Sequence, residues 1–263
     1  MPDADWVRYK QIRGDDLPQL GRWLGSSYQL ERVLKRDFYA IVGLYRKQPD
    51  SAASDAPDLL LLKVYHTDPL GPIPLGWLGR WLCQREARFL EQLGDLPGIP
   101  PLLGRWGPSG YLRAYLPGHN LREFRKSARP DPAFFPELRR ILDRVHQRGV
   151  AHCDLSKPEN VLVLHDGRPA LIDFQIAFAP RCLNWPLVGP LAAALLRYLQ
   201  QVDRYHLTKL HRRSRPDDFS PNAIAAARRK GILLHLHGHL LRRPYRAVRH
   251  AVLKRFLTDD PLL

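Results

Sequence analysis

The sequence predicts an α+β fold, in which a small antiparallel sheet with one helix precedes a larger, mainly helical part. Three observations support this prediction. Short apolar runs separated by turn residues fill the first half of the chain, as in antiparallel sheets. The stretches 77–93 and 131–148 repeat apolar residues at helical steps. A hairpin pattern with polar residues at its rim then follows at 150–176.

Length and composition are those of a chain with a sizeable core. The 263 residues are 44% hydrophobic and contain no run of 18 apolar residues, so no membrane span is predicted. The N-terminus is acidic and lacks an apolar core, which argues against a secretion signal. Cys83, Cys153 and Cys182 show no paired spacing, which favours a reduced, cytoplasmic compartment.

The first half contains the elements of the predicted sheet. Residues 1–25 are punctuated by glycine and proline and are interpreted as a surface extension. Two antiparallel strands are expected over 28–46, joined by Lys35-Arg36-Asp37. An exposed loop precedes the apolar run 59–65, where Lys63 interrupts a buried strand and needs a charged partner.

A helix and a hairpin follow that strand. The apolar residues of 77–93 repeat at three- and four-residue steps, and Glu86 and Glu91 lie on this predicted helix. A hairpin is expected over 102–116, before a break at Pro117-Gly118. The predicted helix 131–148 has Asp131 as its cap, Pro132 at its first position and Gly149 after its end.

The hairpin at 150–176 brings polar groups together. Val161–Leu164 reads as a buried strand, Asp166-Gly167 as its turn, and 170–172 as the return strand. Asp154 and Asn160 precede the first strand and Asp173 ends the second, so all three are expected at one rim. Two carboxylates and an amide suit a hydrated Mg²⁺, and a carboxylate left over can accept a proton from a hydroxyl.

These residues resemble the protein-kinase superfamily. His152-Cys153-Asp154 stands where that family has His-Arg-Asp, Lys157 and Asn160 stand where it has the catalytic-loop lysine and asparagine, and Asp173-Phe174-Gln175 stands where it has Asp-Phe-Gly. The resemblance implies ATP and Mg²⁺ as cofactors. It also implies Asp154 as catalytic base, Lys157 as a catalytic group, and Asn160 and Asp173 as metal ligands.

The same resemblance assigns the nucleotide-binding groups. Lys63 would contact the phosphates and pair with Glu86, with Glu91 as the alternative partner. Lys35 and Arg36 would contact phosphates by side chain, because the chain lacks the glycine-rich phosphate loop; a solvated turn is the alternative. Tyr115 and Leu116 would form the hinge that binds adenine.

The set of motifs over 28–180 is most similar to small bacterial serine/threonine kinase-like proteins, akin to RIO and lipopolysaccharide-core kinases. The implied activity is transfer of the γ-phosphoryl group of ATP to a hydroxyl. A protein serine or threonine and a glycolipid sugar at the inner membrane face stay open as acceptors. Cys153, Gln175 and the missing Ala-Pro-Glu segment depart from the family pattern, and a nucleotide-binding pseudokinase is the non-enzymatic alternative.

The resemblance implies a two-lobed protein-kinase-like fold, with an extension (1–25), an N-lobe (26–116), a C-lobe (117–204) and a basic helical segment (205–263). Residues 177–263 carry 16 Lys and Arg against 5 Asp, which is +11 of the net charge of +15. This segment could contact an anionic membrane, which would place the protein peripherally at the cytoplasmic face. RNA contact without a recognisable nucleic-acid module and an ordinary solvated face are the alternatives. The histidines of 235–239 could form a metal site, although no carboxylate or cysteine lies near them in the sequence.

Overall fold

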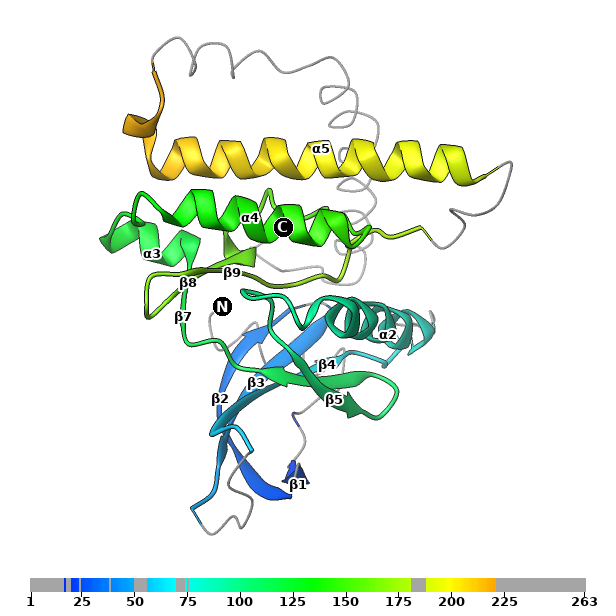
Figure 1. Ribbon diagram of the computed structural model, residues 1–263. Coiled ribbons are helices and arrows are strands. Elements are labelled where there is room, and N and C mark those ends of the chain that lie inside the picture. Colours follow the sequence, from blue (N-terminus) through cyan, green and yellow to red (C-terminus); the bar gives the residue numbers. More distant parts are fainter. Residues whose placement is uncertain are drawn as a thin grey trace, which may run out of the picture.

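The computed structural model describes residues 17, 20–23, 25–37, 39–49, 56–69, 74, 76–180 and 188–220. Within them the fold is a mixed α and β arrangement with two antiparallel sheets (Figure 1). The strands are β1 (Gly21–Trp23), β2 (Ser26–Arg36), β3 (Ala40–Lys47), β4 (Leu59–Tyr65), β5 (Leu102–Trp106), β6 (Gly110–Ala114), β7 (Gly118–Asn120), β8 (Val161–Leu164) and β9 (Pro169–Leu171). The helices are α2 (Gly76–Leu93), α3 (Leu121–Ser127), α4 (Phe134–Gln147) and α5 (Gly189–Ser214), with short 3₁₀ helices η1 (Pro158–Asn160) and η2 (Pro216–Asp218).

The larger sheet has the strand order β1-β2-β3-β4-β6-β5, and its central strands are buried on both faces. Side chains of alternate residues enter different cores, because successive residues of a strand face opposite sides of the sheet. Leu60, Leu62 and Val64 pack in a cluster on one face, whereas Tyr65 belongs to the cluster that contains α2. Lys63 shares the parity of Tyr65 and therefore faces α2.

Two details of this sheet differ from the expectation. Lys35 and Arg36 belong to β2, opposite Val42 and Ile41, and do not form the turn. The turn begins at Asp37, whose carboxylate accepts hydrogen bonds from the backbone N–H groups of Tyr39 (2.8 Å) and Ala40 (2.9 Å). Bulges in β2 break the apolar alternation that would have marked the longer strand.

The expected extension 1–25 also contributes to the sheet. β1 pairs antiparallel with β2. Leu20 is buried in the cluster that contains Leu60, Leu62 and Val64, and Trp23 packs against that cluster. A three-residue strand gives almost no sequence pattern, which is why it was not predicted. Trp6, the other tryptophan of the extension, lies outside the described residues.

The second sheet, β7-β8-β9, lies beside α3 and α4, and α4 and α5 run alongside each other (Figure 1). The expected hairpin is confirmed, with β8 and β9 paired from Val161 opposite Leu171. Gly118 of β7 approaches β8 closely, since an added Cβ would lie 2.3 Å from the Val163 carbonyl oxygen. One continuous core extends from α2 through α4 and the hairpin to Leu207 and Leu210 of α5.

The helical part brings two corrections. The helix predicted from Asp131 begins at Phe134, because the Asp131 carboxylate accepts from the Ala133 N–H (2.8 Å) in a turn that precedes it. The expected boundary at 204/205 falls inside α5, a single helix of 26 residues. Gly149 follows α4 at φ +71°, as predicted for a residue after a helix end.

The rest of the basic segment, 221–263, lies outside the described residues, as do Cys182 and the histidines of 235–239. Among the described helices, none has the length and apolar character needed to cross a membrane.

Candidate functional site

Lys63 joins the strand, the helix and the rim of the hairpin. Its ammonium lies 2.8 Å from Glu86 Oε2 of α2 and 3.2 Å from Asp173 Oδ1, which follows β9 by two residues. Tyr65 donates a hydrogen bond to the same oxygen of Glu86. Glu91, the alternative partner, instead pairs with Arg105 at 2.8 Å. Glu86 is buried because it lies on the face of α2 that packs against the sheet.

The charges around Lys63 shift its pKa and that of Asp173 in opposite directions. Burial alone would lower the pKa of the Lys63 ammonium, but the carboxylates of Asp173 and Glu86 outweigh it and raise that pKa well above its ordinary value. Burial alone would raise the pKa of Asp173, but Lys63, Lys35 and Lys157 hold it well below the ordinary value. Both groups are therefore charged at neutral pH.

The other predicted nucleotide-binding residues lie on neighbouring segments. Lys35 pairs with Asp37 at 2.8 Å, and its charge also acts on Asp173. Arg36 is the last residue of β2. Tyr115 and Leu116 are half-buried in the connection between β6 and β7, where the chain leaves one sheet for the other.

Asp154 lies within a compact group of polar side chains. Lys157 Nζ is 2.6 Å from its Oδ2, and Asn160 Nδ2 donates to the same oxygen and to the backbone carbonyl of Asp154, both at 3.1 Å. The Asp154 side chain is about one-tenth exposed. The lysine side chain is 60% exposed, so this ion pair is accessible to solvent.

Backbone contacts connect this loop to the segment that carries Asp173. The Ile172 N–H donates to the Asn160 carbonyl at 3.0 Å, and a ring nitrogen of His152 lies 3.1 Å from the Ile172 carbonyl oxygen. The His152 ring also packs on the buried Phe174 at 4.7 Å between centroids. Lys157 contacts Asp154 and its charge lowers the pKa of Asp173, so the two acids share one cationic neighbour.

A buried carboxylate of α5 holds the backbone of this loop in place. Asp203 is fully buried, and its two oxygens accept from the backbone N–H groups of His152 (2.7 Å) and Cys153 (2.9 Å). It also lies 3.1 Å from His146 of α4. Asp203 was not among the residues predicted from the sequence. The available signal was a lone acid on the same face of the helix as Leu196, Leu207 and Leu210, where an unpaired charge is costly.

The backbone is unusual at both ends of the site. Cys153 (φ +65°) and Asp173 (φ +67°) are the non-glycine residues with positive φ among the residues described above. Side chains of L-residues disfavour this region, so surrounding contacts must hold it in place. The two hydrogen bonds to Asp203 and the ion pair with Lys63 provide those contacts. Burial raises the pKa of the Cys153 thiol to about 12.

The oxygen donors fit a magnesium ion shared with phosphates. Asn160 uses its amide nitrogen toward Asp154 and keeps its oxygen available, and Asp173 uses Oδ1 toward Lys63 and keeps Oδ2. No cluster of three His, Cys, Asp or Glu ligands occurs in the part of the chain that the structure describes. Two protein oxygens match the preference of Mg²⁺ for water and phosphate in its other positions.

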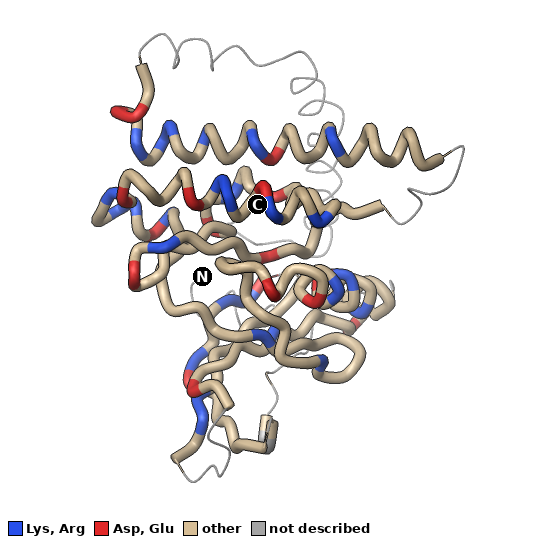
Figure 2. The backbone as a smooth tube through the Cα atoms, in the orientation of Figure 1, with Lys and Arg blue, Asp and Glu red and all other residues tan. Residues whose placement is uncertain are grey.

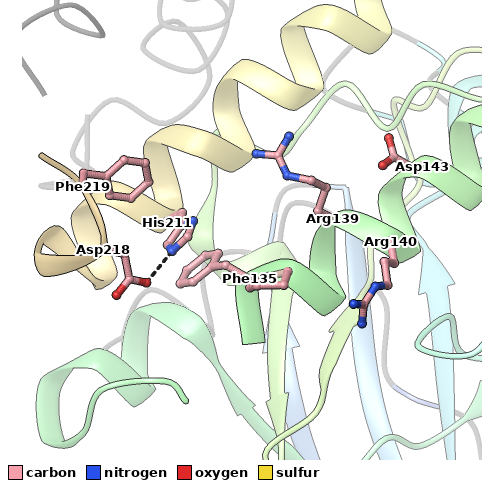
Figure 3. A pocket seen from close by; sticks show the side chains of 8 residues that line it. Phe135, Arg139, Arg140, Asp143, His211, Asp218 and Phe219 are labelled. Carbon is pink, nitrogen blue, oxygen red and sulfur yellow. Dashed lines mark hydrogen bonds and ion pairs between the residues drawn. The ribbon is translucent and has the colours of Figure 1, made fainter. Parts of the chain in front are cut away.

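A separate cavity of about 420 Å³ lies between α4 and η2 (Figure 3). His211 stacks on Phe135 at 4.3 Å between ring centroids and pairs with Asp218 at 2.8 Å, while Asp143, which also lines the cavity, pairs with Arg204. None of the predicted site residues lines this cavity.

Known proteins similar to this chain are serine/threonine kinases. No protein-family profile matches the chain. A serine/threonine-protein kinase named OXI1 from Arabidopsis thaliana is 37% identical over 100 residues, which are 33% of this chain and 23% of that protein. Serine/threonine-protein kinase C from Synechocystis sp. is 34% identical over 110 residues, 38% of this chain and 20% of that protein. The chain thus matches less than a quarter of the length of these relatives.

These matches support a protein-kinase-like superfamily. The antiparallel sheet with α2 is compatible with a kinase-like N-lobe. The kinase-like residues of the sequence also form one connected arrangement: Glu86, Lys63 and Asp173 on one side, Asp154, Lys157 and Asn160 on the other.

Proposed function

We propose that the chain is an ATP-dependent phosphotransferase with two kinase-like lobes, which transfers the γ-phosphoryl group to a serine or threonine hydroxyl of a protein. The observation that carries this proposal is the position of Lys63, buried between Glu86 and Asp173. A lysine that stays charged in a buried place can bind phosphate oxygens at little cost in reorganisation. The similarity to serine/threonine kinases supports the choice of acceptor.

In this proposal the nucleotide lies between the sheet and the hairpin. Tyr115 and Leu116 would contact adenine with their backbone groups. Lys63 and Lys35 would bind phosphates, with Arg36 beside them at the end of β2. The charge of Lys35 lowers the pKa of Asp173, which supports a position near the phosphates. Because the chain lacks a glycine-rich loop, these side chains would bind the phosphates in its place.

The chemistry would be carried by the loop residues. Asp154 accepts the proton of the acceptor hydroxyl while that oxygen bonds to the γ-phosphorus, and the bond to the β,γ-bridging oxygen breaks with its electron pair leaving on ADP. Lys157 stabilises the negative charge on the transferring group. Asn160 and Asp173 would hold Mg²⁺, which supplies neutralisation of phosphate charge when bound.

Labelled ATP with Mg²⁺ and a generic protein acceptor tests this proposal. Wild type should transfer label, and Asp154→Asn should lose orders of magnitude in rate while still binding nucleotide. Asp166→Asn is the matched control, because Asp166 is an exposed carboxylate in the β8–β9 turn that pairs with Arg168. Transfer by Asp154→Asn at the wild-type rate would refute the mechanism.

Two alternatives are outcomes of the same experiment. If the wild-type protein binds nucleotide but transfers no label, it is a pseudokinase. Gln175, in place of the usual final glycine, is the reason to consider this alternative. Label on extracted glycolipid and not on protein would indicate a lipopolysaccharide-core sugar kinase. Kinship to RIO kinases, a cytoplasmic location and membrane contact through 205–263 stay predictions from the sequence.

A further inference from the structure

Glu159, a carboxylate beside the proposed catalytic loop, is paired with a cation. Glu159 lies in η1 between Lys157 and Asn160. Arg122 of α3 pairs with it, with Nη1 2.5 Å from Oε1. Because Glu159 is the acid of this loop next to the proposed acceptor position, its pairing removes the group that would attract a basic acceptor.

Beyond this pair, the rim continues as a cationic surface formed by α3 and the end of α5. Arg125 of α3 reaches Ser214 of α5, with Nη1 3.4 Å from the hydroxyl oxygen. Arg213 precedes Ser214 on α5 and Arg122 is one turn before Arg125 on α3, so this contact brings the three arginines to one surface. Burial lowers the pKa of Arg125, the charges of Arg213 and Arg122 lower it further, and the charge of Glu159 acts in the opposite direction. Figure 2 shows the Lys and Arg positions of α3 and of the end of α5 on the same side of the molecule.

The carboxylates around this surface are committed to other cations. Glu123 pairs with Lys126 at 2.6 Å. Asp217 pairs with Arg129 at 2.5 Å. Asp218 pairs with Arg215 at 2.9 Å and with His211 at 2.8 Å. Within the described ranges, no carboxylate lies in salt-bridge contact with Arg125 or Arg213. Arg122, Arg125 and Arg213 therefore outnumber Glu159, the carboxylate that acts on them, and this surface keeps a net positive charge.

We infer that Arg125 and Arg213 recognise acidic side chains of the acceptor, so that the enzyme phosphorylates serine or threonine in acidic peptide segments. This inference rests on the proposed phosphotransferase function. Lys157 pairs with Asp154, and Glu159, two residues after Lys157, pairs with Arg122, so the surface begins beside the proposed catalytic loop; Arg125 lies one turn further along α3. Acidic side chains a few residues from the phosphorylated hydroxyl would therefore meet these guanidinium groups.

Three serine peptides test this inference. They differ in having acidic, neutral or basic residues on either side of the serine, and kcat/KM with labelled ATP is measured for each at low salt. Wild type should prefer the acidic peptide by about tenfold over the neutral one, the effect of two partly exposed ion pairs. The preference should shrink as ionic strength rises.

Variants locate the preference on this surface. Arg125→Gln with Arg213→Gln should remove most of it, and Arg213→Gln alone should remove part and leaves the Ser214 contact intact. Arg122→Gln frees Glu159 and should raise kcat/KM for the basic peptide. The matched control is Arg168→Gln, an exposed arginine in the β8–β9 turn, which should keep the wild-type preference.

The outcomes separate this inference from the proposed function. Transfer to all three peptides with no acidic preference, or with a basic preference, overturns the inference and leaves the phosphotransferase in place. An acidic preference that survives in the double variant also overturns it. If no peptide is phosphorylated, the protein acceptor of the proposed function is wrong. Transfer of label to extracted glycolipid alone would have the same consequence.

Discussion

Replacement of Asp203 by asparagine tests whether the loop before Asp154 is held by a buried carboxylate. Asp203 accepts one backbone N–H on each oxygen, at 2.7 Å from His152 and 2.9 Å from Cys153. Asparagine keeps the shape of the side chain but presents an NH₂ group in place of one oxygen. One buried N–H donor then faces another donor, and the remaining hydrogen bond loses its charge.

The expected cost follows from these contacts. Loss of a hydrogen bond to a charged group and an unsatisfied buried donor together amount to about 2–4 kcal/mol of unfolding free energy. For a chain of this size that corresponds to roughly 5–15 °C in melting temperature. Cys153 at φ +65° would lose the contact that holds its backbone, so phosphotransfer should fall as well.

Urea unfolding followed by circular dichroism measures this cost, with the transfer of label from ATP assayed in parallel. Asp143→Asn is the matched control. Asp143 of α4 pairs with Arg204 of α5 at 3.0 Å on the exposed side of the same helix pair, and its loss should cost no more than about 1 kcal/mol. If Asp203→Asn unfolds within about 0.5 kcal/mol of Asp143→Asn, the carboxylate does not hold the loop.

Three further predictions concern the site and the second sheet. Lys63→Met should abolish nucleotide binding measured by calorimetry, because no other lysine or arginine is buried among the described residues; binding at wild-type affinity would contradict the assignment. The lowered pKa of Asp173 means that its contribution to stability is complete above about pH 4 and is lost as pH falls through the folded-state pKa. Urea unfolding between about pH 5 and pH 3 should therefore lose stability more steeply in wild type than in Asp173→Asn, and parallel slopes would argue against it. Gly118→Ala should destabilise the protein by more than about 2 kcal/mol, because its Cβ would meet the Val163 carbonyl. The control Gly107→Ala has open space around it and should cost about 1 kcal/mol from its positive φ. Equal costs for the two variants would rule out the close approach of Gly118 to β8.

Sequence patterns were sufficient for the elements that have strong local signals. The apolar run of β4, the helical periodicity of α2 and the Asp-Gly turn of the β8–β9 hairpin each predict the observed element. β1 was missed and β2 was ended too early, because a short strand and a bulged strand do not show regular alternation. The start of α4 was placed too early since Asp131 closes a turn before the helix.

Site residues could be predicted where they belong to a short sequence motif or where burial of a charge requires a partner nearby. A buried lysine requires a carboxylate, which pointed to Glu86 or Glu91 of α2, and the kinase resemblance favoured Glu86, the residue that pairs with Lys63. Asp203 could not be placed in the same way, since its partners are backbone N–H groups of residues about fifty positions earlier. The cationic surface of Arg125 and Arg213 likewise depends on α3 and α5 meeting in space.

The continuity of α5 determines how the C-terminal region can be separated from the rest of the protein. A chain shortened after residue 204 would lose Leu207 and Leu210 from the core and would leave Asp203 at a frayed end. Any loss of activity in such a chain would report unfolding of the loop support and not the role of the basic residues. Deletions that begin after residue 220 preserve the whole helix, so they are the ones that can show what the last part of the chain contributes.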